Sequence, residues 1–170
     1  ASDGMKVAIN VTAMILALVA LVAFIDWILG LGGMFCYNYV PGCSHLAFLS
    51  HLSLKLILGK VFSIFAIIIG VPLHDASTVG ALMGTKLVLN EMVAYVDLTH
   101  VAQSLNPKSF MIASFALCSF GNFGSIAIQI GGIGELAPNQ KKNLARLGLR
   151  ALICGTLSCY LSAAIVGVLL

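Results

Sequence analysis

Apolar residues run almost without interruption through parts of the chain, and the lengths of these runs predict membrane helices. Residues 7–25 carry no charge and the run continues past Asp26 to Leu31, which exceeds the roughly 20 residues that a spanning helix needs. A second uncharged run covers residues 151–170. We therefore expect a first transmembrane helix in residues 1–35, with Asp26 at the membrane interface, and a last transmembrane helix in 151–170.

The pattern changes after the first run. Residues 30–50 are interrupted by glycines and a proline, which favours a loop at the membrane surface. In residues 46–66, leucine and phenylalanine recur near helical spacing while serine, histidine and lysine interrupt them. This alternation is typical of an amphipathic helix lying in the interface. Residues 36–70 are therefore expected to form a loop followed by an interfacial amphipathic helix.

The next apolar stretches are short and carry charge. Glycines, Lys86 and Glu91 interrupt them, so they are poor spanning helices. Irregular backbone at membrane depth is tolerated only where it is buried in protein or lines a cavity. We therefore expect a re-entrant hairpin in residues 71–97.

A longer uncharged run follows at residues 109–134, but the sequence GNFG lies in its middle. Each glycine weakens a helix by about 1 kcal/mol. Broken helices of this kind form the binding sites of many transporters. Residues 109–137 are therefore expected to form a broken transmembrane helix, with two half-helices that meet near Asn122.

The composition supports an all-α integral membrane protein. Sixty per cent of the residues are hydrophobic, 9% are charged, and the mean hydropathy is +1.06. The net charge is only +3, and basic residues gather in residues 138–150, so nucleic acid is not expected as a partner. The positive-inside rule makes this segment, interpreted as a loop, cytoplasmic. In the multi-pass arrangement expected for the plasma (inner) membrane, the C-terminus then lies on the extracellular or periplasmic side.

Polar side chains at the middle of the interrupted segments are the candidate functional groups. Glu91 and Asn90 lie in the hairpin, and Asn122 and Ser125 at the helix break. A carboxylate at bilayer depth costs several kcal/mol unless it is paired or solvated, which makes it a candidate for function. Together these donors and acceptors suit a polyhydroxyl ligand such as a sugar. The alternative is that Glu91 pairs with Lys86 while Asn122 and Ser125 only cap a half-helix.

Other chemistry has weaker support in the sequence. His74 and Asp75 could act as an acid-base pair, but no nucleophile accompanies them, and Asp75 fits a helix N-cap. The histidines lack metal-ligand spacing. We therefore expect no catalytic residue, no metal-binding residue, no bound cofactor and no enzymatic activity. A disulfide between Cys36 and Cys43 remains open.

Two motifs carry a resemblance to a known family. The sequences GTKLVLNEMVAY and SFALCSFGNFGSIAIQIGGIGELAP resemble the C-terminal half of the concentrative nucleoside transporters. The resemblance implies a symporter that moves nucleosides inward on a sodium or proton gradient and assembles as a homotrimer. Its fold would be an inverted repeat, of which this chain is the second half, with residues 1–35 as a scaffold helix. We therefore expect the 170 residues to be half of a transporter.

The resemblance also implies roles for single residues. Glu91, Asn122 and Ser125 would hold the ribose hydroxyls, with Asn90 and Phe123 as possible secondary contacts. The nucleobase contacts and the site of the coupling ion, Na⁺ or H⁺, match nothing here and are expected outside this chain. A transporter of another small polar solute, or a membrane structural subunit without transport activity, remain as alternatives.

Overall fold

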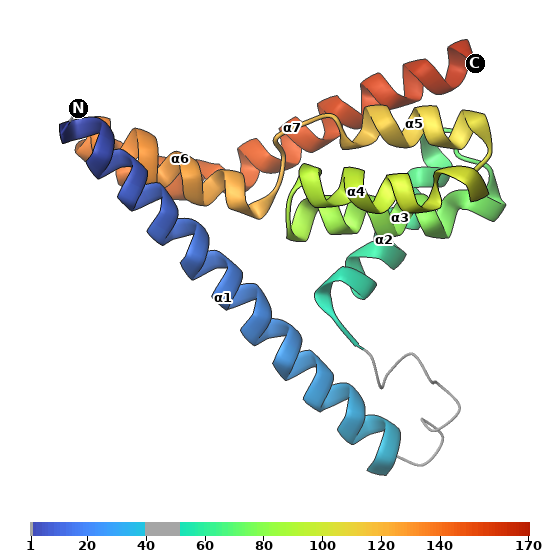
Figure 1. Ribbon diagram of the computed structural model, residues 1–170, viewed down its shortest axis with the longest axis horizontal. Coiled ribbons are helices and arrows are strands. Elements are labelled where there is room, and N and C mark those ends of the chain that lie inside the picture. Colours follow the sequence, from blue (N-terminus) through green and yellow to red (C-terminus); the bar gives the residue numbers. More distant parts are fainter. Residues whose placement is uncertain (1, 40–51) are drawn as a thin grey trace.

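The computed structural model describes residues 2–39 and 52–170, and Figure 1 shows that the regular elements of these residues are helices. They are α1 (Ser2–Tyr39), α2 (Leu54–Ile68), α3 (Leu73–Val88), α4 (Glu91–Val101), α5 (Pro107–Leu117), α6 (Phe123–Leu136) and α7 (Lys141–Leu169), with short 3₁₀ turns at Ala102–Ser104 and Pro138–Gln140. An all-α fold is therefore confirmed for the described residues.

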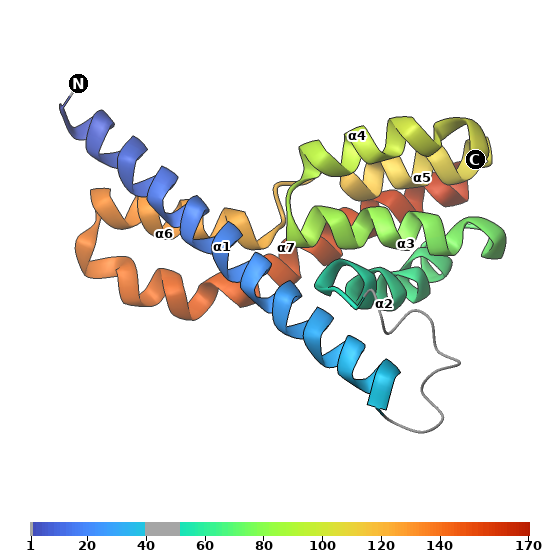
Figure 2. The ribbon, with the colours of Figure 1, turned by 60° about the horizontal axis from the view of Figure 1, so that its bottom comes forward.

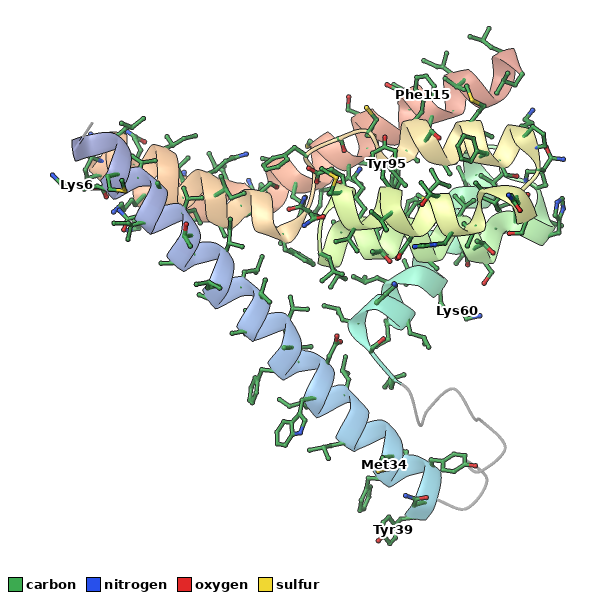
Figure 3. The ribbon with its side chains drawn as sticks, viewed as in Figure 1. Lys6, Met34, Tyr39, Lys60, Tyr95 and Phe115 are labelled. Carbon is green, nitrogen blue, oxygen red and sulfur yellow. The ribbon has the colours of Figure 1, made fainter. Side chains whose placement is uncertain are left out.

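Among the described residues, two helices are long and apolar enough to cross a membrane: Gly4–Tyr39 and Pro138–Leu169. Helix α1 lies beside α6 along its N-terminal part and contacts the start of α2 further along, while its C-terminal end projects away from the other helices (Figures 1 and 2). Most of its large apolar side chains are exposed, among them Leu16 and Trp27. Figure 3 shows side chains that project from α1 away from the other helices, with Met34 and Tyr39 labelled near its end. Such a surface suits lipid or another protein segment.

Helix α2 begins where α1 reaches it. The Asp26 carboxylate accepts a hydrogen bond from the Leu54 backbone N–H at 2.6 Å, and the Ser53 hydroxyl accepts one from Leu56 at 3.1 Å. Together these two side chains satisfy backbone donors that a helix start leaves unpaired. Asp26 therefore links α1 to α2 rather than only facing water.

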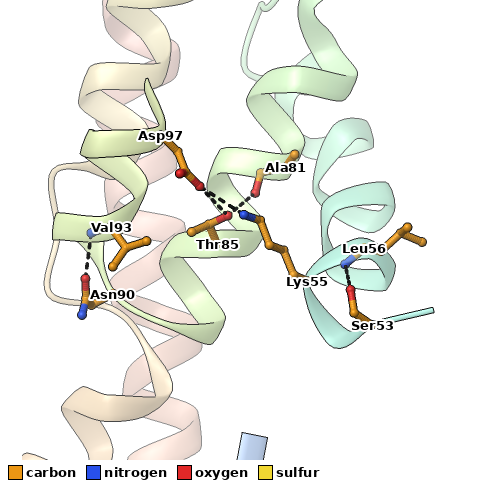
Figure 4. A network of polar contacts seen from close by, with 8 residues as sticks. All are labelled: Ser53, Lys55, Leu56, Ala81, Thr85, Asn90, Val93 and Asp97. Carbon is orange, nitrogen blue, oxygen red and sulfur yellow. Dashed lines mark hydrogen bonds and ion pairs between the residues drawn. The ribbon is translucent and has the colours of Figure 1, made fainter. Parts of the chain in front are cut away.

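Helices α3 and α4 form a helical hairpin, and α2 packs closely along α3. Gly80 makes this approach possible, because a Cβ atom there would collide with the backbone of Ser63. Nearer the start of α2, Lys55 forms an ion pair with Asp97 on α4 at 3.1 Å, next to the hydroxyl of Thr85 on α3 (Figure 4). Helix α2 thus contacts both arms of the hairpin.

The hydrophobic core lies where α2, the hairpin, α5 and α7 meet. Its fully buried members are Ala66, Val79, Met83, Ala94, Ile112, Ala113, Ala116, Leu117 and Ala163. Most of these side chains are small, which lets short helices pack closely. The core therefore holds the hairpin against the helix pair that follows it.

Several segment boundaries differ from the expected ones. The first helix continues to Tyr39, and the hairpin's second helix continues to Val101. The described part of the amphipathic segment becomes helical at Leu54, whereas residues 40–51 lie outside the described residues, as does the proposed pairing of Cys36 with Cys43. The structure shows a helical hairpin, and its re-entrant placement in a membrane stays a prediction.

The loop expected in residues 138–150 is instead a 3₁₀ turn followed by the first turns of α7, which begins at Lys141. Leucine and alanine make up most of the positions between the basic residues, and these types favour helix together with lysine and arginine, which outweighs Asn143 and Gly148. Pro138 and Asn139 are the adjacent pair with strong turn chemistry, and the 3₁₀ turn begins there. The positive charges therefore lie on a helix that continues into the last apolar run.

Candidate functional site

The hairpin tip and the interruption between α5 and α6 face each other. Glu91 is the first residue of α4, and Asn122 is the N-cap of α6. The Asn122 amide Nδ2 donates a hydrogen bond to the Glu91 carboxylate at 2.9 Å. Asn122 is 2% exposed, whereas Glu91 is half-buried. The fold thus joins two of the predicted site residues across 31 positions of sequence.

Asn122 and Ser125 also form a capping box. The Asn122 Oδ1 atom accepts a hydrogen bond from the Ser125 backbone N–H at 2.8 Å, and the Ser125 hydroxyl accepts one from the Asn122 N–H at 3.3 Å. The same hydroxyl donates to the Asn122 carbonyl at 2.6 Å. The capping interpretation therefore holds for this pair, and the cap orients the amide that reaches Glu91.

The predicted alternative partner of Glu91 is bound elsewhere. Lys86 donates hydrogen bonds to the Ala116 carbonyl at 3.0 Å and the Ser119 hydroxyl at 2.6 Å. In the part of the chain that the structure describes, no ion pair joins Lys86 to Glu91. Glu91 therefore keeps most of its acceptor sites, because a carboxylate offers about four and Asn122 fills one.

The two secondary candidates occupy different places. The exposed Asn90 is the N-cap of α4, and its side chain accepts a hydrogen bond from the Val93 N–H at 2.9 Å (Figure 4). Phe123 lines a separate apolar cavity of about 260 Å³, together with Val61 of α2 and Tyr160 of α7. Asn90 thus shapes the hairpin tip, while Phe123 lies in a cavity whose lining does not include Glu91.

A cavity of about 310 Å³ lies over the Asn122–Glu91 contact. Its polar side is the hairpin tip with Asn122, and apolar residues of α1, including Leu18 and Val22, line it as well. Phe120, in the interruption, also lines it, although nothing in the spacing of the sequence singled this residue out. The cavity is therefore assembled from three segments that are distant in sequence.

Ser125 lines a second cavity of about 250 Å³, between α6 and α7, rather than the cavity that contains Glu91. Gln129 and Ser119 are its other polar side chains, and Phe120 lines both cavities. Hydrogen bonds therefore connect Glu91, Asn122 and Ser125. Glu91 and Asn122 line the first cavity, whereas Ser125 lines the second.

His74 and Asp75 have structural partners. The Asp75 carboxylate accepts a hydrogen bond from the Asn106 N–H at 3.1 Å and lies 3.3 Å from the exposed His74 imidazole. Helix α3 has Pro72 as its N-cap, so Asp75 lies within the first turn and is not the cap. Asp75 thus joins the start of α3 to the start of α5. No group of three potential metal ligands occurs among the residues described.

Comparisons with known proteins agree on one family. Residues 1–167 match the family described as "Na+ dependent nucleoside transporter C-terminus". The chain is 47% identical to the "Uncharacterized transporter YutK" of Bacillus subtilis over 98% of its own length and 39% of that protein. It is 38% identical to the "Nucleoside permease NupC" of Helicobacter pylori, over 98% of this chain and 38% of that protein.

Among solved structures, a doubly substituted CNTnw in an outward-facing state resembles the chain with a TM-score of 0.83 and 39% identity. The match covers 99% of this chain and 40% of that one. The chain thus spans about two fifths of the length of the Bacillus subtilis and Helicobacter pylori relatives.

Proposed function

Because this chain belongs to the Na⁺-dependent nucleoside transporter family, we propose that it supplies the ribose-binding half of a site through which a longer protein takes up nucleosides. Its relatives are transporters and not enzymes, and the chain is part of a membrane protein. The name of the Helicobacter pylori relative, a nucleoside permease, supports the substrate class.

One observation carries the proposal: the Asn122 amide meets the Glu91 carboxylate beside the 310 Å³ cavity. Glu91 retains acceptors for the adjacent hydroxyls of a ribose, and the Asn122 amide retains a second N–H. A hydrogen bond from a hydroxyl to a charged carboxylate contributes about 1.5–3 kcal/mol, roughly twice the value of a neutral one. The pair therefore suits a vicinal diol.

Ser125 has a different part in the same proposal. Its hydroxyl proton is committed to the Asn122 carbonyl, so the oxygen can offer a ligand only its remaining lone pair. Its main contribution is to hold Asn122 in the capping geometry that aims Nδ2 at Glu91. Asn90 contributes by fixing the hairpin tip, and Phe123 contributes apolar packing beyond it.

Uptake is coupled to an inward flow of Na⁺ or H⁺, with the ion site contributed by the part of the protein outside this chain. The family description, which names Na⁺ dependence, supports this coupling. The longer protein, called the parent from here on, works as a homotrimer in the plasma (inner) membrane. The basic start of α7 lies in the cytoplasm and the C-terminus of this chain outside. The exposed apolar length of α1 supports a contact with lipid or a second subunit.

Replacing Glu91 with Gln in the full-length parent tests the site. The amide keeps the side chain's shape but loses the charged acceptors, so uptake of radiolabelled uridine should fall at least about tenfold. Glu135→Gln is the matched control, because Glu135 lies at the far end of α6 and accepts its hydrogen bond from Asn10. Unchanged uptake in the Glu91 variant would remove the assigned role.

Two further measurements separate the alternatives. Competition of unlabelled nucleosides, amino acids and sugars against uridine identifies the solute class, and competition by sugars or amino acids alone would favour another polar solute. A structural subunit whose polar groups only cap helices predicts that Glu91→Ala lowers the amount of folded protein as much as it lowers uptake. A normal amount of protein with low uptake supports the transporter.

A further inference from the structure

Helix α5 ends with the buried residues Ala116 and Leu117, and its last carbonyl groups have donors. A helix leaves its last four C=O groups without partners within the helix. Here the donors are the Tyr95 hydroxyl to Ser114 at 2.8 Å, the Cys118 N–H to Phe115 at 3.2 Å, the Lys86 ammonium to Ala116 at 3.0 Å and the Ser119 N–H to Leu117 at 2.8 Å. Two of these donors, Tyr95 and Lys86, come from the hairpin.

Lys86 is the charged member of this set. It is 1% exposed, and its ammonium lies 2.6 Å from the Ser119 hydroxyl, 3.9 Å from the Cys159 sulfur and 5.8 Å from the Tyr160 ring centre. Within residues 2–39 and 52–170, no carboxylate forms an ion pair with it. A buried charge is costly unless it is paired. The partial negative charge at the end of α5 therefore acts as the counter-charge of Lys86.

The hairpin thus holds both sides of the interruption between α5 and α6. Lys86 binds Ala116 and Ser119 before the interruption, and Glu91 binds Asn122 after it. Lys86 lies near the end of α3 and Glu91 at the start of α4, so the short hairpin tip joins the two residues. A shift of one contact is therefore passed to the other through this tip.

We propose that Lys86 is a positioning residue, which fixes the end of α5 and so sets where Asn122 meets Glu91. It does not contact the ligand: it is absent from the lining of the 310 Å³ cavity. The transport readout of this proposal rests on the proposed function, so a second readout independent of transport is needed.

The first test measures uridine uptake by the parent carrying Lys86→Met. The half-saturating concentration should rise on the order of tenfold, because a displaced Asn122 would cost the ligand about one charge-assisted hydrogen bond, while the maximal rate changes less. Lys55→Met is the matched control, since it removes an exposed lysine that pairs with Asp97 and should leave the half-saturating concentration unchanged. A fall in maximal rate alone would overturn the proposal.

Ser119→Ala removes one partner of Lys86 and should raise the half-saturating concentration less than Lys86→Met does. The half-saturating concentration of the double variant should be no higher than that of Lys86→Met, because Lys86→Met already removes the Lys86–Ser119 hydrogen bond. Additive effects would show that the residues act separately. If Lys86→Met does not reach the membrane, an unchanged half-saturating concentration in Ser119→Ala overturns the proposal on its own.

The second test needs no substrate. Cys159 is 8% exposed and its thiol donates to the Phe115 and Ala116 carbonyls at 3.1 and 3.3 Å. In a parent whose other cysteines are replaced, a membrane-permeant maleimide should label Cys159 slowly. Lys86→Met should speed this labelling at least about threefold by freeing the end of α5, and Lys55→Met should not. Protection retained in Lys86→Met would overturn the proposal, even if the parent took up no nucleoside.

Discussion

At the scale of single residues, Asn122 combines two tasks that the sequence presented as alternatives. Its Oδ1 atom caps α6 and its Nδ2 atom binds Glu91. The pattern of Asn122 followed by Ser125 could be read as a capping box from the sequence alone. The contact with Glu91 could not, because it depends on how the hairpin packs against the interruption.

Substituting Asn122 separates these two tasks. Asn122→Asp keeps an oxygen that can cap the Ser125 N–H, but it places a second carboxylate where Nδ2 now lies 2.9 Å from Glu91. We expect uptake to fall at least about tenfold through like-charge repulsion, with protein abundance near normal. Asn122→Ala also removes the cap, which costs about 1 kcal/mol, and should reduce abundance as well. Equal loss of abundance in both variants would contradict this separation. Uptake and membrane abundance are measured together.

At the scale of elements, the glycine pattern was the most informative part of the sequence. GNFG predicted an interruption, and Gly124 lies so close to the cap that a Cβ atom there would be 3.0 Å from Asn122 Oδ1. The basic residues were misleading, because a charge cluster reports membrane topology and not local backbone structure. Leucine and alanine between those residues carried the helical signal that makes α7 begin at Lys141.

The packing of α2 on α3 gives a stability prediction. Gly80→Ala should destabilise the purified parent by about 1–3 kcal/mol, because the added methyl group meets the backbone of Ser63 and the helices must separate. Gly155→Ala is the control, since no atom outside its own helix lies within 4 Å of the position. It should be neutral or stabilise α7 by up to about 1 kcal/mol. The midpoint of thermal unfolding reports both effects, and a similar shift for the two variants would refute the close-contact explanation.

At the scale of the whole molecule, the candidate site depends on α1, which the sequence showed only as a spanning helix. Leu18 and Val22 line the cavity, whereas most large apolar side chains of α1 are exposed. Periodicity could not identify these lining residues, because α1 is apolar on all sides. The partners of Lys86 could not be read from the sequence either, because they come from α5, the interruption and α7.

A larger side chain on α1 that fills part of this cavity tests the role of α1. Leu18→Trp should lower uridine uptake at least about fivefold, because the indole fills space beside the Glu91 and Asn122 side chains. Leu16→Trp places the same group on an exposed face and should leave uptake near normal. Competition with small and large nucleosides measures the change in usable volume. Equal uptake by the two variants would exclude α1 from the site.

The contacts of the hairpin with both sides of the interruption limit where related chains can gain or lose residues. Lys86 and Glu91 are spaced along one stretch so that they reach Ala116 and Asn122 on another. An insertion in either stretch would move one contact out of register with the other. The lengths of the hairpin tip and of the interruption are therefore matched, and a change of length in one is tolerated only with a compensating change in the other.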